Sequence, residues 1–174
     1  MFGRPYGCAM TPFSDAVKAV QTARGSRKGY AKVEAHGGFA TAVTPELAAW
    51  LAEQVTSYLA TASADGQPYI QHRGGPPGFL RVLDTHTLAW LDYAGNRQYI
   101  STDNLAENAK ACLFVMDYAH KQRVKFWGTA RVVTDDPALV AKLVAADYPA
   151  KVEQVIVFMI AMWDGNCPQH IPDL

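Results

Sequence analysis

The middle of the chain consists of short apolar runs separated by turns of only a few residues. The run SYLATASA at 57–64 ends in Asp65-Gly66, and the run PYIQH begins at Pro68. Asp-Gly between two such runs is a strong signal for a tight β-hairpin turn. Because such a turn can join only antiparallel strands, the pattern predicts consecutive hairpins and excludes a parallel sheet in this region.

Further strand pairs follow along the chain. FLRVLD at 79–84 pairs with TLAWLDY at 87–93 in a second predicted hairpin, and the runs at 110–118 and 122–134 form a third. The last run, EQVIVFMIAMW at 153–163, is almost continuously apolar, which is typical of a strand buried on both faces. About seven such strands predict an antiparallel sheet that closes into a barrel, since closure removes exposed edges.

Helices are expected toward the ends of the chain, and one more is expected between two strands. Ser14 is a candidate N-cap for a helix over 15–23, with Val17 and Val20 on one face. Thr44-Pro45 opens a helix of about ten residues with an apolar stripe. Between them, the basic stretch 24–32 is interpreted as a solvated connector.

The domain organisation follows from these elements. Asp136-Pro137 opens another helix before the last strand. Residues 1–13 hold several glycines and prolines and are expected to be irregular. The sequence therefore predicts a mainly β fold of the α+β type, with one barrel domain over 14–174 that carries N-terminal helices.

Composition argues against several functions. The chain has 16 basic and 16 acidic residues and a formal net charge of zero, so it lacks the field that would gather nucleic acid or an anionic membrane. No apolar run reaches the roughly 18–20 residues that span a bilayer. The first ten residues lack the apolar region of a secretory signal. We therefore expect a cytoplasmic protein.

The three cysteines predict neither a disulfide framework nor a metal site. Cys8, Cys112 and Cys167 are an odd, widely separated set. Cys167 and His170 are spaced as two zinc ligands would be, but no second pair exists to complete a structural site. No metal is predicted.

The stretch DYAGNRQ at 92–98 has the composition of an anion-binding turn. Gly95 would allow a tight turn after a strand, and Asn96 is a good N-cap. Arg97 and Gln98 would then occupy the first helical turn, where unpaired N–H groups and a guanidinium suit a phosphate. An ordinary helix start with a surface arginine explains the same residues, so both interpretations stay open.

A second group of polar residues, QHRGGPPG at 71–78, comes off the end of a strand. Its two glycines would allow the backbone to approach a flat ligand closely. Taken singly, His72 is more often a structural histidine, Arg73 a surface ion-pair residue, and the Gly-Gly-Pro-Pro run a rigid turn. Together they favour a corner that binds an anion or an amide.

In this order the motifs resemble the FMN-binding split-barrel family of pyridoxamine 5'-phosphate oxidase. The similarity covers roughly residues 14–174 and is greatest to the flavin-binding branch that ends in NCPQHI; GNRQ and NCPQHI are its most specific pieces. The resemblance implies a split β-barrel of antiparallel strands with peripheral helices. It also implies a homodimer with FMN in the clefts between its subunits.

The resemblance further implies which residues contact the cofactor. The family's phosphate-binding Ser-Arg-Lys turn matches 96–98, where glutamine replaces the lysine, and Arg73 is placed to compensate. Residues 71–75 would run beside the isoalloxazine ring, and a glutamine that reaches the flavin from the partner subunit is replaced by Arg123. The implied cofactor residues are Gln71, His72, Arg73, Gly74, Gly75, Leu91, Asp92, Asn96, Arg97, Gln98, Arg123 and Trp163.

The C-terminal residues that would contact a substrate differ from those of the family. In the oxidases an Arg-x-His pair after the late tryptophan binds the substrate phosphate, whereas this chain reads Gln169-His170-Ile171. The arginine is absent, so pyridoxamine 5'-phosphate is not the expected substrate. Asn166, Gln169 and His170 are predicted to bind an unidentified small molecule, and His170 is the candidate proton donor.

These features lead to one expected function and two alternatives. The first is an FMN-dependent oxidoreductase with NAD(P)H as a candidate electron donor. The second is a non-catalytic flavin carrier or stress-related sensor. The third keeps the barrel and replaces FMN by deazaflavin or haem.

Overall fold

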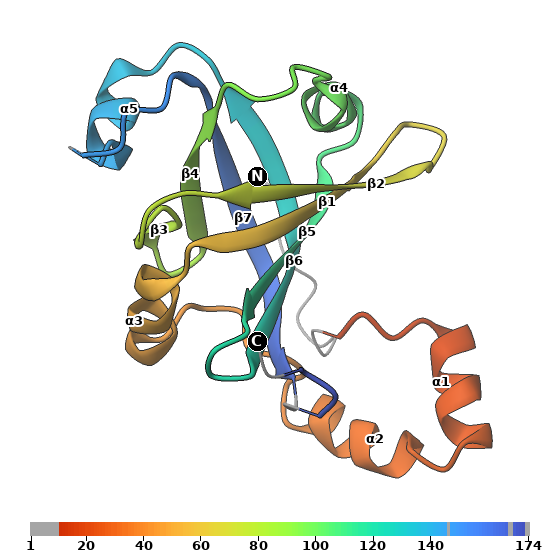
Figure 1. Ribbon diagram of the computed structural model, residues 1–174. Helices are drawn as coiled ribbons and strands as arrows, with labels where there is room; N and C mark the ends of the chain where they lie inside the picture. The colour runs from red at the N-terminus through yellow and green to blue at the C-terminus, as the bar shows by residue number, and fades with distance from the viewer. Residues whose placement is uncertain (1–10, 146, 167–168, 173–174) are drawn as a thin grey trace.

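The computed structural model describes residues 11–145, 147–166 and 169–172, and within them the protein is built on one antiparallel sheet (Figure 1). The sheet has seven strands in the order β2-β1-β5-β6-β7-β4-β3. The three predicted hairpins are confirmed. The strands are β1 Thr56–Ala62, β2 Pro68–Gly74, β3 Arg81–Asp84, β4 Thr87–Tyr93, β5 Lys110–Asp117, β6 Gln122–Val133 and β7 Val152–Asn166.

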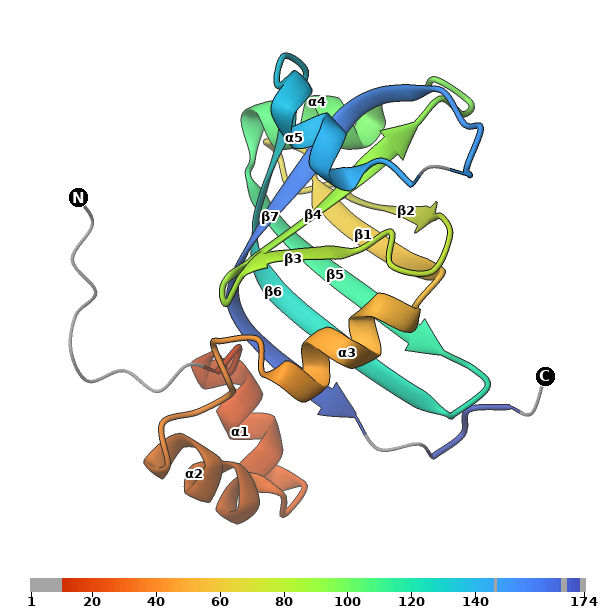
Figure 2. The same cartoon turned by 90° about the vertical axis from the view of Figure 1, so that its left-hand side faces the viewer.

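The sheet curls around one hydrophobic core. Trp90, Phe126 and Phe158 are at most 1% exposed and lie at its centre. Helix α3, Pro45–Glu53, lies across one end of the barrel and buries Leu47 and Leu51 there (Figure 2). The predicted helix after Thr44 is thus confirmed, and the hydroxyl of Thr44 accepts the predicted capping bond from the amide of Leu47.

The last strand is buried on both faces along its first half, as predicted. Ile156 and Phe158 face the barrel core, whereas Val155 and Val157 pack with Leu143 of helix α5, Pro137–Leu143. Beyond them Met159 is 47% exposed. The burial of both faces of β7 therefore depends on α5, which covers the outside of the barrel only beside the first half of this strand.

The barrel is split, because its ladder of hydrogen bonds between strands does not form a closed ring. In the described part of the chain, β2 and β3 are the two ends of the strand order. The ends of β2 and β4 are bridged by side chains instead, through an ion pair between Arg73 and Asp92. This gap in the strand pairing leaves room for a cavity.

Two helices precede the barrel, α1 at Asp15–Ala23 and α2 at Arg27–Ala35. The prediction of α1 is confirmed. The interpretation of 24–32 as a solvated connector is wrong in part: these residues are exposed except for Arg27, but from Arg27 onward they form a helix and not a connector. Arg27 contacts Glu34 two helical turns later and also donates to Gln21 of α1, with Nη1 and Oε1 2.6 Å apart. These partners bind the basic side chain within the protein, so the segment folds as a helix.

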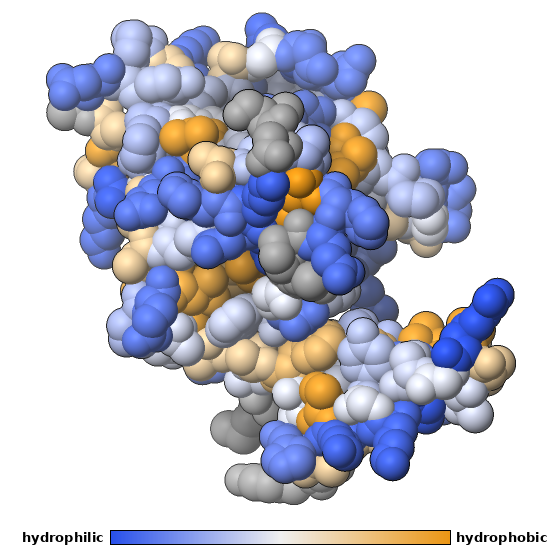
Figure 3. Space-filling model, turned by 60° about the horizontal axis from the view of Figure 1, so that its bottom comes forward, coloured by the Kyte–Doolittle hydropathy of each residue, from blue (hydrophilic) through white to orange (hydrophobic). Residues whose placement is uncertain are grey.

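The apolar face predicted for α1 is not buried. Val17 and Val20 do share a side of the helix, but they are 38% and 61% exposed, whereas Gln21 is buried. Figure 3 shows apolar residues interspersed with hydrophilic ones on one face of the molecule. The helix pairs with α2 through polar groups, and this pairing decides which side of α1 faces inward.

Candidate functional site

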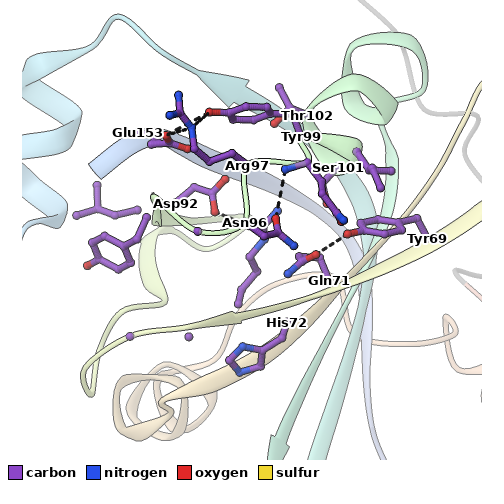
Figure 4. A pocket seen from close by; sticks show the side chains of 18 of the residues that line it. Tyr69, Gln71, His72, Asp92, Asn96, Arg97, Tyr99, Ser101, Thr102 and Glu153 are labelled. Carbon is purple, nitrogen blue, oxygen red and sulfur yellow. Dashed lines mark hydrogen bonds and ion pairs between the residues drawn. The ribbon is translucent and has the colours of Figure 1, made fainter. Parts of the chain in front are cut away.

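A cavity of about 480 Å³ lies at the split of the barrel, between the ends of β2 and β4 and the start of helix α4, Ile100–Glu107 (Figure 4). Its volume lies within the range typical of small-molecule sites. Two stretches that are about 20 residues apart in sequence meet here. The predicted cofactor residues that line it are Gln71, His72, Arg73, Gly74, Gly75, Leu91, Asp92, Asn96, Arg97 and Gln98.

The predicted helix start at residue 96 is wrong, because α4 begins at Ile100. Arg97 and Tyr99 have φ of 59° and 56°, in the left-handed region that interrupts an α-helix. The side chain of Asn96 accepts a bond from the amide of Gln98 at 3.3 Å, so it stabilises a local turn and not a helix cap. Residues 96–99 form a loop over the cavity.

The helix N-terminus that faces the cavity lies four residues later than predicted. Ile100, Ser101 and Thr102 form the first turn of α4, and all three line the cavity. Their N–H groups have no acceptor within the helix and carry its partial positive charge. The run Ser-Thr-Asp at 101–103 is typical of a helix start and was the available sequence signal.

Ser101 contributes an unused donor to this end of the cavity. Its side chain is buried, with the residue 3% exposed, and its hydroxyl has no hydrogen-bond partner among the described residues. A buried hydroxyl without a partner costs free energy, so such a group in a cavity is typical of a ligand site.

A buried network holds the first arginine of the cavity. Arg73 Nη1 lies 2.5 Å from Asp92 Oδ1, and Asp92 Oδ2 accepts from Gln154 Nε2 at 2.8 Å. The same amide nitrogen also lies 2.9 Å from Thr102 Oγ1 and thereby links β7 to α4. Asp92 neutralises Arg73, and Arg73 Nε is buried without a partner in the described structure.

The second arginine is held at the rim. Arg97 Nε donates to Tyr99 Oη at 2.9 Å and lies 3.5 Å from Glu153 Oε1, and Tyr99 Oη donates to the same carboxylate at 3.2 Å (Figure 4). The bond to Tyr99, followed by the charges of Tyr99 and Glu153, raises the pKa of Arg97.

Two predicted cavity residues have structural explanations. His72 Nε2 lies 2.7 Å from Thr56 Oγ1, and the ring meets Tyr58 edge-on, on the opposite side of β2 from Gln71 (Figure 4). A Cβ on Gly75 would lie 2.7 Å from Cβ of Phe79, so that glycine is required by the packing of its own turn. These findings favour the structural interpretation of both residues.

The remaining predicted site residues lie elsewhere in the chain. Arg123 on β6 is paired with Asn166 at the far end of β7, and Trp163 Nε1 donates to the carbonyl of Ala42 at 2.9 Å. Gln169 and His170 follow and are exposed. The side chain of Asn166 and all of Cys167 lie outside the described residues, as do residues 1–10.

The two groups of predicted residues cannot meet within one chain. Glu153 at the cavity and Trp163 are ten residues apart on β7, which corresponds to roughly 30 Å along a strand. Of the described residues, no three His, Cys, Asp or Glu side chains are grouped to hold a metal. No described helix has the length and apolar character needed to cross a membrane.

Comparison with known proteins supports the resemblance seen in the sequence. The model of the pyridoxamine 5'-phosphate oxidase family matches residues 43–165, which begins after α2. No curated protein matches the chain.

Solved structures share the fold. The chain is similar to HupZ from Group A Streptococcus, with a TM-score of 0.57 and 19% identity over 76% of this chain and 98% of that one. It is also similar to a putative pyridoxamine 5'-phosphate oxidase from Lactobacillus delbrueckii, with a TM-score of 0.53 and 26% identity over 71% and 94% of the two chains. The split-barrel prediction is confirmed.

Proposed function

Because the chain belongs to the pyridoxamine 5'-phosphate oxidase family, we propose that it is an FMN-dependent oxidoreductase acting on an unidentified small molecule. Proteins of this family commonly bind flavins. The observation that carries the proposal is the buried hydroxyl of Ser101, which has no partner among the described residues and lines the cavity at the start of α4.

The phosphate of FMN would bind at this end of the cavity. The N–H groups of the first turn of α4 and the hydroxyl of Ser101 supply donors, and Arg97 supplies a full positive charge within the same lining. Free amides at a helix start, a hydroxyl and a guanidinium are the donor set that phosphate groups favour. The set fits a phosphate although the lysine of the family turn is Gln98 here.

The isoalloxazine ring would lie along the end of β2. Residues 71–75 line the cavity there, and the guanidinium of Arg73 would face the polar edge of the ring. FMN supplies the hydride or electron transfer when bound, and the protein binds and orients it. A positive group near that edge favours the reduced anionic flavin, an effect that Asp92 reduces by pairing with Arg73.

The remaining predicted residues would reach the ligand from a second subunit. Arg123, Trp163 and Asn166 belong to the far end of the β6–β7 pair, where Trp163 lies roughly 30 Å along the strand from Glu153 of the same chain, and Gln169 and His170 follow the end of β7. A two-fold dimer would place them beside the partner's cavity. We therefore propose a homodimer in which each flavin contacts both subunits.

We expect purified protein to carry flavin, visible as the absorbance of oxidised FMN and identified by mass analysis of the released ligand. Arg97→Ala should raise the dissociation constant for FMN about tenfold, the scale of a hydrogen bond to a charged group. Arg24→Ala is the matched control, because Arg24 is an exposed arginine at the end of α1 that does not line the cavity. An unchanged constant for Arg97→Ala would contradict the phosphate assignment.

A dimer with shared sites predicts complementation. Arg97→Ala and Arg123→Ala subunits should each bind FMN weakly as homodimers, because each lacks one contact in both sites. Their heterodimer holds one site with both arginines, so co-expression with two affinity tags should restore tight binding at half of the sites. Isothermal titration calorimetry of the heterodimer, purified on both tags, measures the fraction of sites that bind FMN tightly. If all sites bind FMN weakly, Arg123 does not act across an interface.

Gln169 favours a second function, a non-catalytic flavin carrier, because it stands where the oxidases place a substrate arginine. The two functions are distinguished by adding NADH or NADPH to the flavin-loaded protein without oxygen. Loss of the flavin absorbance, with recovery in air, supports the oxidoreductase. A flavin that no reductant of this class bleaches supports the carrier.

A further inference from the structure

The charged groups of the cavity are balanced in pairs. Among the described residues its lining holds two arginines and two carboxylates: Arg73 pairs with Asp92, and Arg97 pairs with Glu153. The first pair lies in the buried network of β2, β4, β7 and α4. The second pair is at the rim, where the Arg97 side chain is 68% exposed. Only the second pair can separate without leaving an arginine buried and unpaired.

The backbone places Glu153 at this position by an irregularity of β7. Asp92 pairs with Gln154 and the next residue of β4, Tyr93, pairs with Val152, so Glu153 is an extra residue with no partner in the ladder. Such a β-bulge changes the direction of a side chain that regular alternation would point to the other face. Glu153 lines the cavity, and its neighbour Gln154 is buried in the network.

The residues that meet Glu153 are held in an unfavourable backbone conformation. Arg97 and Tyr99 both have positive φ, and both side chains bond to each other and approach the same carboxylate oxygen. Positive φ in residues other than glycine costs free energy and is concentrated at functional sites. The loop 96–99 is thus arranged to present Arg97 and Tyr99 to a carboxylate that is part of the protein.

From these observations we infer that Glu153 is an internal competitor for the anion site, which restricts the cavity to ligands that carry a phosphate group. The inference rests on the proposed function. A ligand carboxylate carries the same charge as Glu153 and gains little by replacing it at Arg97. A phosphate monoester carries a charge of about −1.5 to −2 and three acceptor oxygens, so it can replace Glu153 and also use Ser101 and the first turn of α4.

The test is Glu153→Gln, which removes the charge and keeps an oxygen that can accept from Tyr99. The dissociation constant for FMN is expected to fall about tenfold, because the negative charge next to the phosphate is gone. The constant for riboflavin, which lacks the phosphate, should stay the same. Glu107→Gln is the matched control: Glu107 is the last residue of α4, is exposed and does not line the cavity.

Two results would overturn the role of Glu153. One is that Glu153→Gln and Glu107→Gln lower the dissociation constant for FMN equally, which would reveal a general effect of net charge. The other is that Glu153→Gln lowers the dissociation constant for riboflavin as much as that for FMN, which would show that Glu153 does not act on the phosphate.

A titration with inorganic phosphate, followed by phosphorus NMR, separates this inference from the proposed function. If neither flavin binds any variant, but phosphate binds Glu153→Gln more tightly than the parent protein, Glu153 is the competitor of an anion site that serves another phosphate ligand. If phosphate affinity is also the same in both proteins, the inference fails together with the proposed function.

Discussion

Replacing Gly128 by alanine is expected to lower the free energy of unfolding by about 3 kcal/mol, at the upper end of the usual cost of overpacking. Gly128 lies where the β6–β7 register shifts, and a Cβ built on it would be 1.9 Å from the carbonyl oxygen of Met159 and 3.0 Å from Cε1 of Phe158. The first obstacle is backbone in a central strand and cannot rotate away. The methyl group must therefore push β6 and β7 apart next to a fully buried phenylalanine.

Gly165→Ala is the matched control for this substitution. Gly165 belongs to the same pair of strands, but a Cβ built on it meets nothing within 4 Å, so its replacement should change stability by less than about 0.5 kcal/mol. Urea denaturation followed by circular dichroism measures both variants. Equal stability of the two would show that the strands can adjust at the bulge.

The second large effect is expected at Asp92. Asp92→Ala should lower the free energy of unfolding by about 3 kcal/mol, because it leaves Arg73 charged and unpaired in a position where its side chain is only 16% exposed. Gln154 Nε2 also loses one of its two acceptors. We place the effect at the lower end of the range for buried ion pairs, since Arg73 is not completely removed from water.

The double variant Arg73→Met/Asp92→Leu tests this explanation. It removes both charges and retains apolar volume, so it should be clearly more stable than Asp92→Ala although it carries one more substitution. Thermal unfolding of the parent, Arg73→Met, Asp92→Leu and the double variant completes a mutant cycle. If the double variant is as unstable as Asp92→Ala, the loss arises from the shape of the side chains and not from an uncompensated charge.

Hydrophobic period and turn chemistry were sufficient to predict most of the fold. Asp65-Gly66 specifies a hairpin by its local conformation alone, and the cap at Thr44 specifies a helix start in the same way. The helix α2 was missed because the contacts that fix it reach another element: Arg27 donates to Gln21 of α1, and Glu34 pairs with Lys18 of α1. No local pattern in 24–32 records those contacts.

For the candidate site too, the local features were predicted from the sequence and the tertiary contacts were not. Sequence patterns identified 71–78 and 92–98 as polar segments at strand ends, because glycines, amides and arginines in such places are local signals, although 71–74 belong to β2. Their meeting in one cavity, the start of α4 at Ile100, and the pairing of Arg97 with Glu153 depend on how β2, β4 and β7 are arranged. The sequence by itself determined the hairpins and the turns, since these depend on neighbouring residues. Only the tertiary structure decided which charges face each other, because charge pairing depends on distances between residues far apart in the chain.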